Sequence, residues 1–297
     1  MSTKIVITGA NGQVGRAVLR KLWDTSAESF AVTRVQASLQ ATRVFTCSLE
    51  ADRVQRCIRQ ADAVIHLAGT LFPQTSNSYY GANVATTAAV LKAARDSNVK
   101  RIVFLSYIDA DPASSNEYLK TKGQAEELLQ STGIPTVVFR SAHIIGSPQW
   151  PGPTAESLLS TDGEPVKVLG TGNQLIAPVY VEDAATAIVS AVEKGRAGIY
   201  ELCGPDRMSM NDLVKLLNRS KDVAMRHLPG RLAKFLAKVT PNFPPPLVEV
   251  MLRQSVGNPA PAMTEFGFSL TSLTNVWNFG TPHKTGVQPM NQEVSLT

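Results

Sequence analysis

The sequence predicts an α/β protein built on a doubly wound parallel sheet, followed in the chain by a small C-terminal α/β lobe. Uniformly apolar segments of strand length alternate with segments of helical periodicity, the first of them runs into a glycine-rich turn, and a turn-rich break follows residue 146. Strands that are apolar on both faces are typical of a sheet covered by helices on both sides.

The first element is an apolar strand from Lys4 to Thr8, which leads into a turn with glycines at every third position and then an amphipathic helix. Gly9 permits the tight turn, Gly12 lets a pyrophosphate approach the backbone, and Gly15 lets the helix pack closely on the strand. Free N–H groups and the dipole at the helix start favour an anion. The segment therefore predicts a Rossmann-type dinucleotide site that includes Gly9, Asn11, Gly12, Gln13, Val14 and Gly15.

The remaining elements of the first domain, residues 1–146, alternate in the same way. Five further apolar strands are expected, at residues 30–34, 43–47, 63–67, 101–106 and 136–139. Three helices are expected between them, at residues 50–60, 84–95 and 117–131.

The second domain is expected at residues 147–279, where elements become shorter and turns more frequent. A strand entering a helix at 179–185 and a strand at 198–202 are expected in it, and some strands of this domain are expected to return to the main sheet. Residues 280–297 are polar and lack aromatic side chains, so a flexible tail is expected there.

Composition narrows the classes of function. The 297 residues are 43% hydrophobic and 18% charged, with a net charge of +5. Basic residues are dispersed, so we expect no nucleic-acid binding, and no apolar run reaches the length of a membrane span. Without a leader segment, the expected location is the cytoplasm. Cys47, Cys57 and Cys203 are unevenly spaced and the histidines do not cluster, so no metal site is expected.

A second group of polar residues predicts acid–base chemistry. Tyr118 and Lys122 lie four residues apart on one face of the expected helix, and Ser106 ends the preceding strand. A phenol titrates near pH 10, so a fixed cation such as Lys122 is needed to favour its phenolate. The Ser106 hydroxyl could hold a substrate carbonyl or alcohol. Tyrosine and lysine also meet at this spacing on many solvated helix faces.

Three other polar residues have two interpretations each. His66 lies within an apolar strand, which favours a hydrogen-bonded core residue over a ligand. His143 lies in a turn expected to face the cofactor. Asn83 could cap the following helix or hold active-site backbone or water.

Together these residues resemble the short-chain dehydrogenase/reductase superfamily. The resemblance rests on the glycine turn, on residues 62–69, on Asn83 and Ser106, and on the Tyr118–Lys122 pair. Residues 116–126, 140–146 and 178–183 are most similar to the extended and atypical branches, which include sugar-nucleotide epimerase-like proteins, NmrA-like proteins and relatives of a nucleotide-binding accessory subunit of respiratory complex I.

The resemblance implies further site residues. Ser48 and Leu49 would lie beside the adenine, Leu67, Ala68 and Gly69 along the cofactor, and Ser141 and His143 near the nicotinamide. Ser106, Tyr118 and Lys122 would be catalytic, with Lys122 also binding the cofactor. Tyr107 follows Ser106 where the family often has a second serine, so it is expected to reshape the substrate pocket.

The residue type at the end of the second strand indicates whether the cofactor is NAD(H) or NADP(H). This position carries Thr33 and Arg34 instead of the carboxylate expected for NAD, and Arg34 could pair with a 2′-phosphate. NADP(H) is therefore favoured, and NAD(H) is possible.

The expected function is NADP(H)-dependent oxidoreduction of a carbonyl/alcohol pair in a small molecule. One alternative is a nucleotide-sugar epimerase or dehydratase that uses hydride transiently. The other is a non-catalytic NAD(P)H-binding protein acting in assembly or redox sensing. A homodimer or a protein partner is possible under each.

Overall fold

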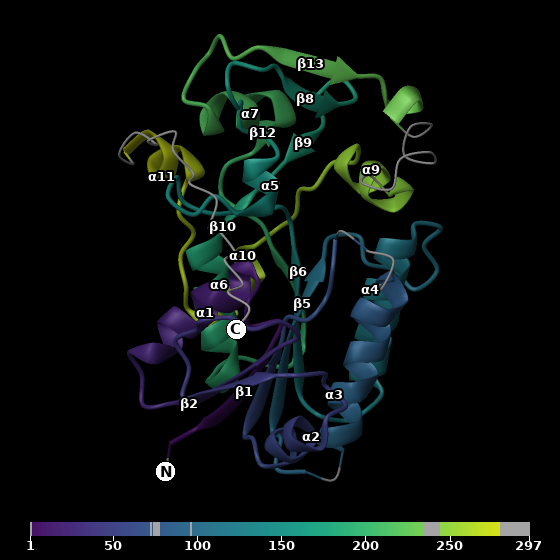
Figure 1. Cartoon of the computed structure of the whole chain (residues 1–297), viewed down its shortest axis with the longest axis vertical. Helices are drawn as coiled ribbons and strands as arrows, with labels where there is room; N and C mark the ends of the chain where they lie inside the picture. Colours follow the sequence, from purple (N-terminus) through teal and green to yellow (C-terminus); the bar gives the residue numbers. More distant parts are fainter. Residues whose placement is uncertain (1, 72, 74–77, 96, 234–243, 280–297) are drawn as a thin grey trace, which may run out of the picture.

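The computed structural model describes residues 2–71, 73, 78–95, 97–233 and 244–279. These residues form a sheet domain, in the lower half of Figure 1, and a lobe above it. The expected tail at 280–297 lies outside the described residues.

The main sheet has seven parallel strands within the described residues, in the order β11-β6-β5-β4-β1-β2-β3. The strands are β1 (Lys4–Thr8), β2 (Glu28–Thr33), β3 (Arg43–Thr46), β4 (Ala63–His66), β5 (Arg101–Tyr107), β6 (Thr136–Ser141) and β11 (Gly198–Leu202). The predicted parallel sheet is confirmed. The chain changes direction across the sheet between β1 and β4, which is where open α/β sheets bind ligands.

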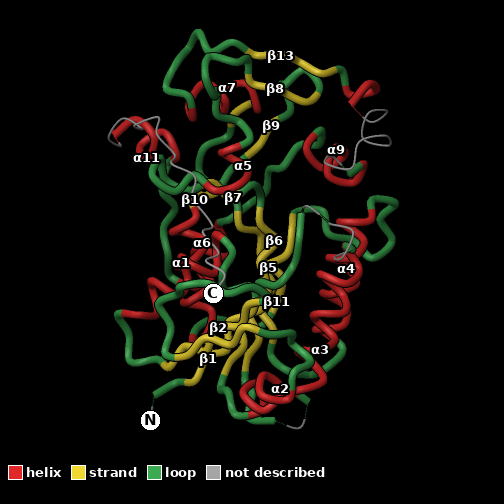
Figure 2. The backbone as a smooth tube through the Cα atoms, in the orientation of Figure 1, coloured by secondary structure: helices red, strands yellow, loops and turns green. Residues whose placement is uncertain are grey.

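Helices cover both faces of this sheet (Figure 2). One face packs against α1 (Gln13–Trp23), α6 (Val181–Glu193) and α10 (Ala260–Phe266), and the other against α2 (Asp52–Arg59), α3 (Thr86–Ala94) and α4 (Glu117–Gln130). Neighbouring strand residues enter opposite cores: Ile7 packs with the first set and Val6 with the second, both fully buried. This two-sided burial explains why the strands are apolar without alternation.

The helix expected to begin at Val84 starts four residues earlier. Residues Tyr80–Ala85 form a π-helical turn, η1, which continues directly into α3. Asn83 therefore lies inside a helix, and the interpretation of Asn83 as an N-cap is wrong. Single π-turns are frequently found at functional sites.

The lobe has short strands and a core of its own. Its elements are β7 (Ile144–Ile145), α5 (Gly152–Glu156), β8 (Val166–Leu169), β9 (Leu175–Ile176), β10 (Val179–Tyr180), β12 (Met208–Ser209), α7 (Met210–Leu217), β13 (Met225–Leu228), α9 (Pro245–Met251) and α11 (Leu273–Phe279). Buried Trp277 donates from Nε1 to the Gly146 carbonyl at 3.1 Å, which joins α11 to the point where the chain enters the lobe. Between lobe segments, α6 and β11 lie with the main sheet. Among the described residues, no helix is both long and apolar enough to traverse a bilayer.

Candidate active site

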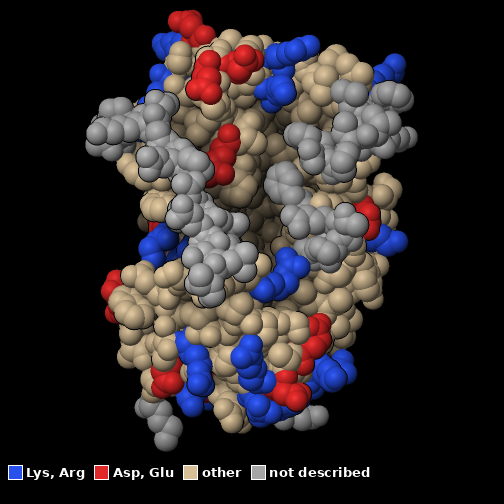
Figure 3. Space-filling model, in the orientation of Figure 1, with Lys and Arg blue, Asp and Glu red and all other residues tan. Residues whose placement is uncertain are grey.

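A cavity of about 320 Å³ lies at the carboxyl ends of β1, β4 and β5, beneath the lobe. The face seen in Figure 3 is hollowed between the lobe and the sheet domain. The cavity brings together most of the residues expected from the sequence: Gly9, Gly12, Gln13, Val14, Gly15, Leu67, Gly69, Ser106, Tyr118, Lys122, Ser141 and His143. Tyr107 from β5, expected to reshape the substrate pocket, also lines it, as do Pro153, Thr154 and Met251 from the lobe.

The three glycines of the turn have different surroundings. Gly9 has φ +63°, and a Cβ there would lie 2.7 Å from the Leu67 carbonyl carbon. A Cβ on Gly15 would lie 2.6 Å from the Gly9 carbonyl oxygen. A Cβ on Gly12 would have one atom within 4 Å, the Gly9 oxygen at 3.3 Å, so its surroundings are the least crowded of the three. Gly9 and Gly15 are thus required for packing, whereas Gly12 is open for a ligand to approach.

Two polar groups converge on Gly69. A Cβ on Gly69 would lie 2.8 Å from Asn83 Oδ1 and 3.1 Å from Lys122 Nζ. Asn83 is fully buried and its Nδ2 donates to Thr121 Oγ1 at 3.0 Å, yet its Oδ1 has no hydrogen-bond partner. A buried acceptor without a partner costs free energy unless a ligand satisfies it. The open glycine turn and this unpartnered oxygen fit a dinucleotide laid across Gly12 and Gly69.

The phenol of Tyr118 is held at the start of α4. Asn116 caps this helix by accepting from the Tyr118 backbone N–H at 3.1 Å. The Tyr118 ring packs against those of Tyr79 and Tyr107, with centroids 5.6 and 5.5 Å away. Burial raises the pKa of Tyr118 well above its ordinary value, so the phenol is a neutral donor in this state.

Lys122 is the one charged residue among those described as lining the cavity. Its Nζ donates to the Leu105 carbonyl at 2.9 Å and lies 4.8 Å from the centre of the Phe104 ring. Burial lowers its pKa to about 8, although the nearby Glu126 carboxylate raises it in part. An ammonium has three protons, so Lys122 retains donors for a ligand after its bond to Leu105.

Ser106 lines the cavity, but its hydroxyl is already engaged elsewhere. It donates to Glu126 Oε1, and the same carboxylate forms an ion pair with Arg140, whose Nη2 lies 2.6 Å from Oε2. The hydroxyl therefore fastens β5 to α4 and β6. This geometry favours a bracing role over the catalytic role expected for Ser106.

Tyr107 and His143 form a polar pair at the cavity. The Tyr107 hydroxyl lies 3.1 Å from His143 Nδ1. His143 Nε2 is buried without a hydrogen-bond partner. Burial lowers the pKa of His143 to about 4, so its imidazole is neutral at neutral pH.

The interpretation of His66 as a core residue is confirmed, because it is fully buried and bonded at both ring nitrogens. Nδ1 lies 2.7 Å from Thr8 Oγ1 and Nε2 lies 3.0 Å from Thr87 Oγ1. Thr87 donates its hydroxyl proton to the Asn83 carbonyl at 2.6 Å, so it must accept from His66, which places the imidazole proton on Nε2. Thr8 then donates to Nδ1 and accepts from Ala68 N–H at 3.1 Å. This series of hydrogen bonds connects the glycine turn to η1.

Six expected cofactor residues do not line this cavity: Asn11, Arg34, Ser48, Leu49, Ala68 and Asn83. Leu49 is buried in the core against α2, and Ser48 beside it is exposed. Arg34 is exposed beyond the end of β2. Arg16 was not predicted, yet it donates to the Asn11 carbonyl at 3.1 Å and to the Ser38 carbonyl at 3.2 Å. The sequence signal that could have identified Arg16 is its position directly after the third glycine of the turn.

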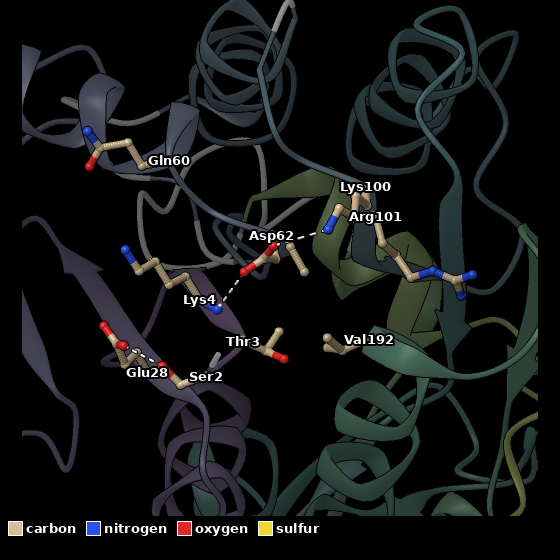
Figure 4. A pocket seen from close by; sticks show the side chains of 10 residues that line it. Ser2, Thr3, Lys4, Glu28, Gln60, Asp62, Lys100, Arg101 and Val192 are labelled. Carbon is tan, nitrogen blue, oxygen red and sulfur yellow. Dashed lines mark hydrogen bonds and ion pairs between the residues drawn. The ribbon is translucent and has the colours of Figure 1, made fainter.

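A larger hollow, of about 810 Å³, lies at the amino ends of the strands (Figure 4). Among its charged groups, Asp62, Lys100 and Arg101 pair with each other or with backbone. Asp62 accepts from the Lys4 backbone N–H at 3.0 Å and from Lys100 Nζ at 3.5 Å, while Arg101 donates to carbonyls at the end of α6, including that of Lys194 at 2.8 Å. This hollow lies at the opposite edge of the sheet from Tyr118 and Lys122.

Comparisons with known proteins agree with the fold described above. A family model described as the NAD dependent epimerase/dehydratase family matches residues 5–203. A UDP-2-acetamido-2,6-beta-L-arabino-hexul-4-ose reductase of Pseudomonas aeruginosa is 28% identical over 200 residues, covering 64% of this chain and 50% of the relative. Subunit 9 of the NADH dehydrogenase (ubiquinone) 1 alpha subcomplex, mitochondrial, of Arabidopsis thaliana is 28% identical over 167 residues, covering 52% and 40%. The chain thus spans half or less of the length of these relatives.

Solved structures share the fold. A UDP-glucuronic acid 4-epimerase from Bacillus cereus in complex with NAD superposes with a TM-score of 0.75 at 18% identity, over 93% of this chain and 96% of the other. At this identity the likeness concerns the fold alone.

Proposed function

Because this chain belongs to the NAD dependent epimerase/dehydratase family, we propose that it binds a pyridine dinucleotide across the glycine turn and catalyses hydride chemistry at a carbon bearing a hydroxyl or carbonyl oxygen. The observation that carries the proposal is the convergence at Gly69 of Lys122 Nζ and the buried, unpartnered Asn83 Oδ1; Gly69, Lys122 and Tyr118 line the cavity. Bound there, the nucleotide would supply the hydride acceptor and donor.

The side chains of the cavity carry out proton transfer and hold the nucleotide. The Tyr118 hydroxyl gives a proton to the substrate oxygen in reduction and takes it back in oxidation. Lys122 holds the nucleotide and supplies the positive charge that favours the Tyr118 phenolate when a proton must be taken up. Burial of both groups excludes water from the proton transfer.

The family's description and the solved neighbour's title support the epimerase or dehydratase alternative better than net NADP(H)-dependent oxidoreduction. In the proposed reaction, hydride leaves the substrate and returns to it, so no nucleotide is consumed. The substrate class that the neighbours' titles suggest is a nucleotide sugar.

The test uses the purified full chain with UDP-glucose, UDP-glucuronic acid and dTDP-glucose, each with NAD and with NADP. Chromatography detects an epimer or a dehydrated product, and absorbance at the nicotinamide band reports net reduction. Turnover should fall at least about 100-fold in Tyr118→Phe with nucleotide binding retained. Net nucleotide reduction would favour the oxidoreductase, and binding without turnover of any substrate would favour a non-catalytic binder.

The phosphorylated form of the cofactor is supported by charge at the adenosine end. Arg34 follows β2, and Arg16 donates to the loop after it at Ser38. No carboxylate stands at the end of β2 to accept from ribose hydroxyls. Titration with NADH and NADPH should show tighter binding of NADPH, lost in Arg34→Ala. Tighter binding of NADH than of NADPH, with neither affinity changed in Arg34→Ala, would instead assign NAD(H), the form bound in the solved neighbour.

A further inference from the structure

Two consecutive residues at the end of β5 face different partners. Both contact residues of α4, at positions about two turns apart along that helix. Ser106 donates to Glu126 on α4, whereas the Tyr107 hydroxyl lies beside His143 and its ring packs edge-on against Tyr118. The hydroxyl that the sequence assigned to the substrate is engaged elsewhere, and a phenol lies on the side of Tyr118.

The hydrogen bond between Tyr107 and His143 can be made in two directions. If Tyr107 donated to Nδ1, His143 would carry its proton on Nε2, which is buried without a partner. If Nδ1–H donates to the phenol oxygen, Nε2 is an unpartnered acceptor instead. The second arrangement releases the Tyr107 O–H from His143 and leaves its proton to the Ser255 side chain or to a ligand in the cavity.

We propose that Tyr107, oriented by His143, donates the hydrogen bond that polarises the substrate oxygen from the side opposite the Tyr118 hydroxyl. This inference rests on the proposed function and replaces Ser106 as the polarising group. Both phenols line the cavity, their ring centroids are 5.5 Å apart, and His143 reaches it from the chain segment after β6. A substrate oxygen between them would accept from two fixed donors, an arrangement that stabilises developing negative charge.

The two phenols differ in what surrounds them. Tyr107 has a neutral imidazole beside its oxygen, and burial raises its pKa, so it remains a donor. Tyr118 lies four residues before Lys122 on the same helix, and the proposed function uses Lys122 as the cation for proton uptake. Tyr107 therefore holds the oxygen while Tyr118 exchanges the proton.

The probe for this site is p-nitrophenol at a pH where it is ionised, because its phenolate oxygen mimics the charge that develops on a substrate oxygen. A cavity of about 150 Å³ already holds benzene, and this one is about 320 Å³. Binding to the full chain, with and without saturating NADPH, is followed by the shift of the probe's absorbance. Tyr107→Phe should weaken binding about tenfold or more, the loss expected for a hydrogen bond to a charged acceptor.

Tyr79→Phe is the matched control. Tyr79 belongs to the same aromatic cluster, but its hydroxyl donates to the Leu71 carbonyl at 3.1 Å. It should change p-nitrophenol binding less than about twofold. At position 143, His143→Gln retains a donor for the phenol oxygen and should bind within a few-fold of wild type, whereas His143→Leu should match Tyr107→Phe.

Imidazole NMR reads the orientation of the pair directly. The chain has four histidines, so ¹⁵N labelling of histidine gives a spectrum in which His143→Leu assigns the signal. His143 should carry its proton on Nδ1 and His66 on Nε2, so the two buried histidines should show opposite tautomers.

The proposal is overturned if His143 carries its proton on Nε2, if Tyr107→Phe binds p-nitrophenol as tightly as wild type, or if wild type does not bind it. Failure of the proposed function has a separate signature, which is the absence of pyridine nucleotide binding in wild type. Loss of probe binding in Tyr118→Phe alone would leave the proposed function standing and remove Tyr107 from it.

Discussion

Substitution of the turn glycines should separate nucleotide binding from folding. Gly12 has φ −70°, and a Cβ there would have only the Gly9 oxygen within 4 Å, at 3.3 Å. Gly12→Ala should therefore cost about 1 kcal/mol or less, the scale of an unfavourable N-cap. The new methyl group would occupy the open space above the turn, where we place the phosphates. Nucleotide affinity should fall about tenfold or more, the lower range of overpacking effects.

Gly15→Ala should behave in the opposite way. Its Cβ would lie 2.6 Å from the Gly9 oxygen and 2.7 Å from the Ala10 carbonyl carbon, both backbone atoms that cannot move aside cheaply. An overpacking cost of about 3 kcal/mol is offset by about 1 kcal/mol of helix propensity, which leaves about 2 kcal/mol. For a chain of this size, that loss lowers Tm by about 4–8 °C, against about 2–4 °C at most for Gly12→Ala.

The assays are thermal unfolding by circular dichroism and fluorescence titration with NADH and NADPH. Gly133→Ala serves as control: this residue has φ +73° and open space around it, so it should lose about 1 kcal/mol from backbone strain and keep full nucleotide binding. The reasoning is refuted if Gly12→Ala binds nucleotide like wild type, or if it lowers Tm as much as Gly15→Ala does.

Three further predictions concern the residues around the cavity. Because the pKa of Lys122 is lowered to about 8, NADPH binding should weaken as pH rises through that value; Lys122→Met should abolish the dependence, exposed Lys120→Met should keep it, and a flat wild-type profile would contradict it. His66, with its pKa lowered by burial to about 3, stays neutral in the fold, while the unfolded chain takes up a proton below its ordinary pKa of 6.5. The free energy of unfolding that His66 contributes should therefore fall as pH decreases from 6.5 to about 3, at about 1.4 kcal/mol per pH unit. Urea unfolding should show the slope removed in His66→Gln and kept in exposed His227→Gln; equal slopes in the two variants would count against it. Ser106→Ala should cost about 1 kcal/mol in the same unfolding assay and leave turnover within a few-fold, whereas a loss of about 100-fold would restore its catalytic role.

Much of the sheet domain could be predicted because its signals are local. The apolar strands differ from the surrounding helices in periodicity, and two-sided burial needs no knowledge of distant partners. The start of the helix at Tyr80 was missed because a π-turn has no distinct hydrophobic period. Lobe strands such as Ile144–Ile145 have two residues, too few for any alternation to be read.

For the site, too, local motifs could be predicted from the sequence, whereas contacts that depend on the tertiary fold could not. Local spacing identified the glycine turn and the pair of Tyr118 and Lys122, and the structure brings them to one cavity. The orientation of Ser106 depends on Glu126, twenty residues later, and the unpartnered oxygen of Asn83 becomes apparent only with the fold complete. Alternation along a strand shows that neighbouring residues diverge, but tertiary packing decides which of them faces the ligand.

Calorimetric titration of the full wild-type chain with NAD, NADH, NADP and NADPH tests the central claim most directly. Saturation at one nucleotide per chain by at least one of the four is the expected result, since the chain offers one glycine turn with an open Gly12 and one acceptor at Asn83 beside it within the described residues. Absence of heat with all four nucleotides would contradict the assignment of this cavity to a pyridine dinucleotide.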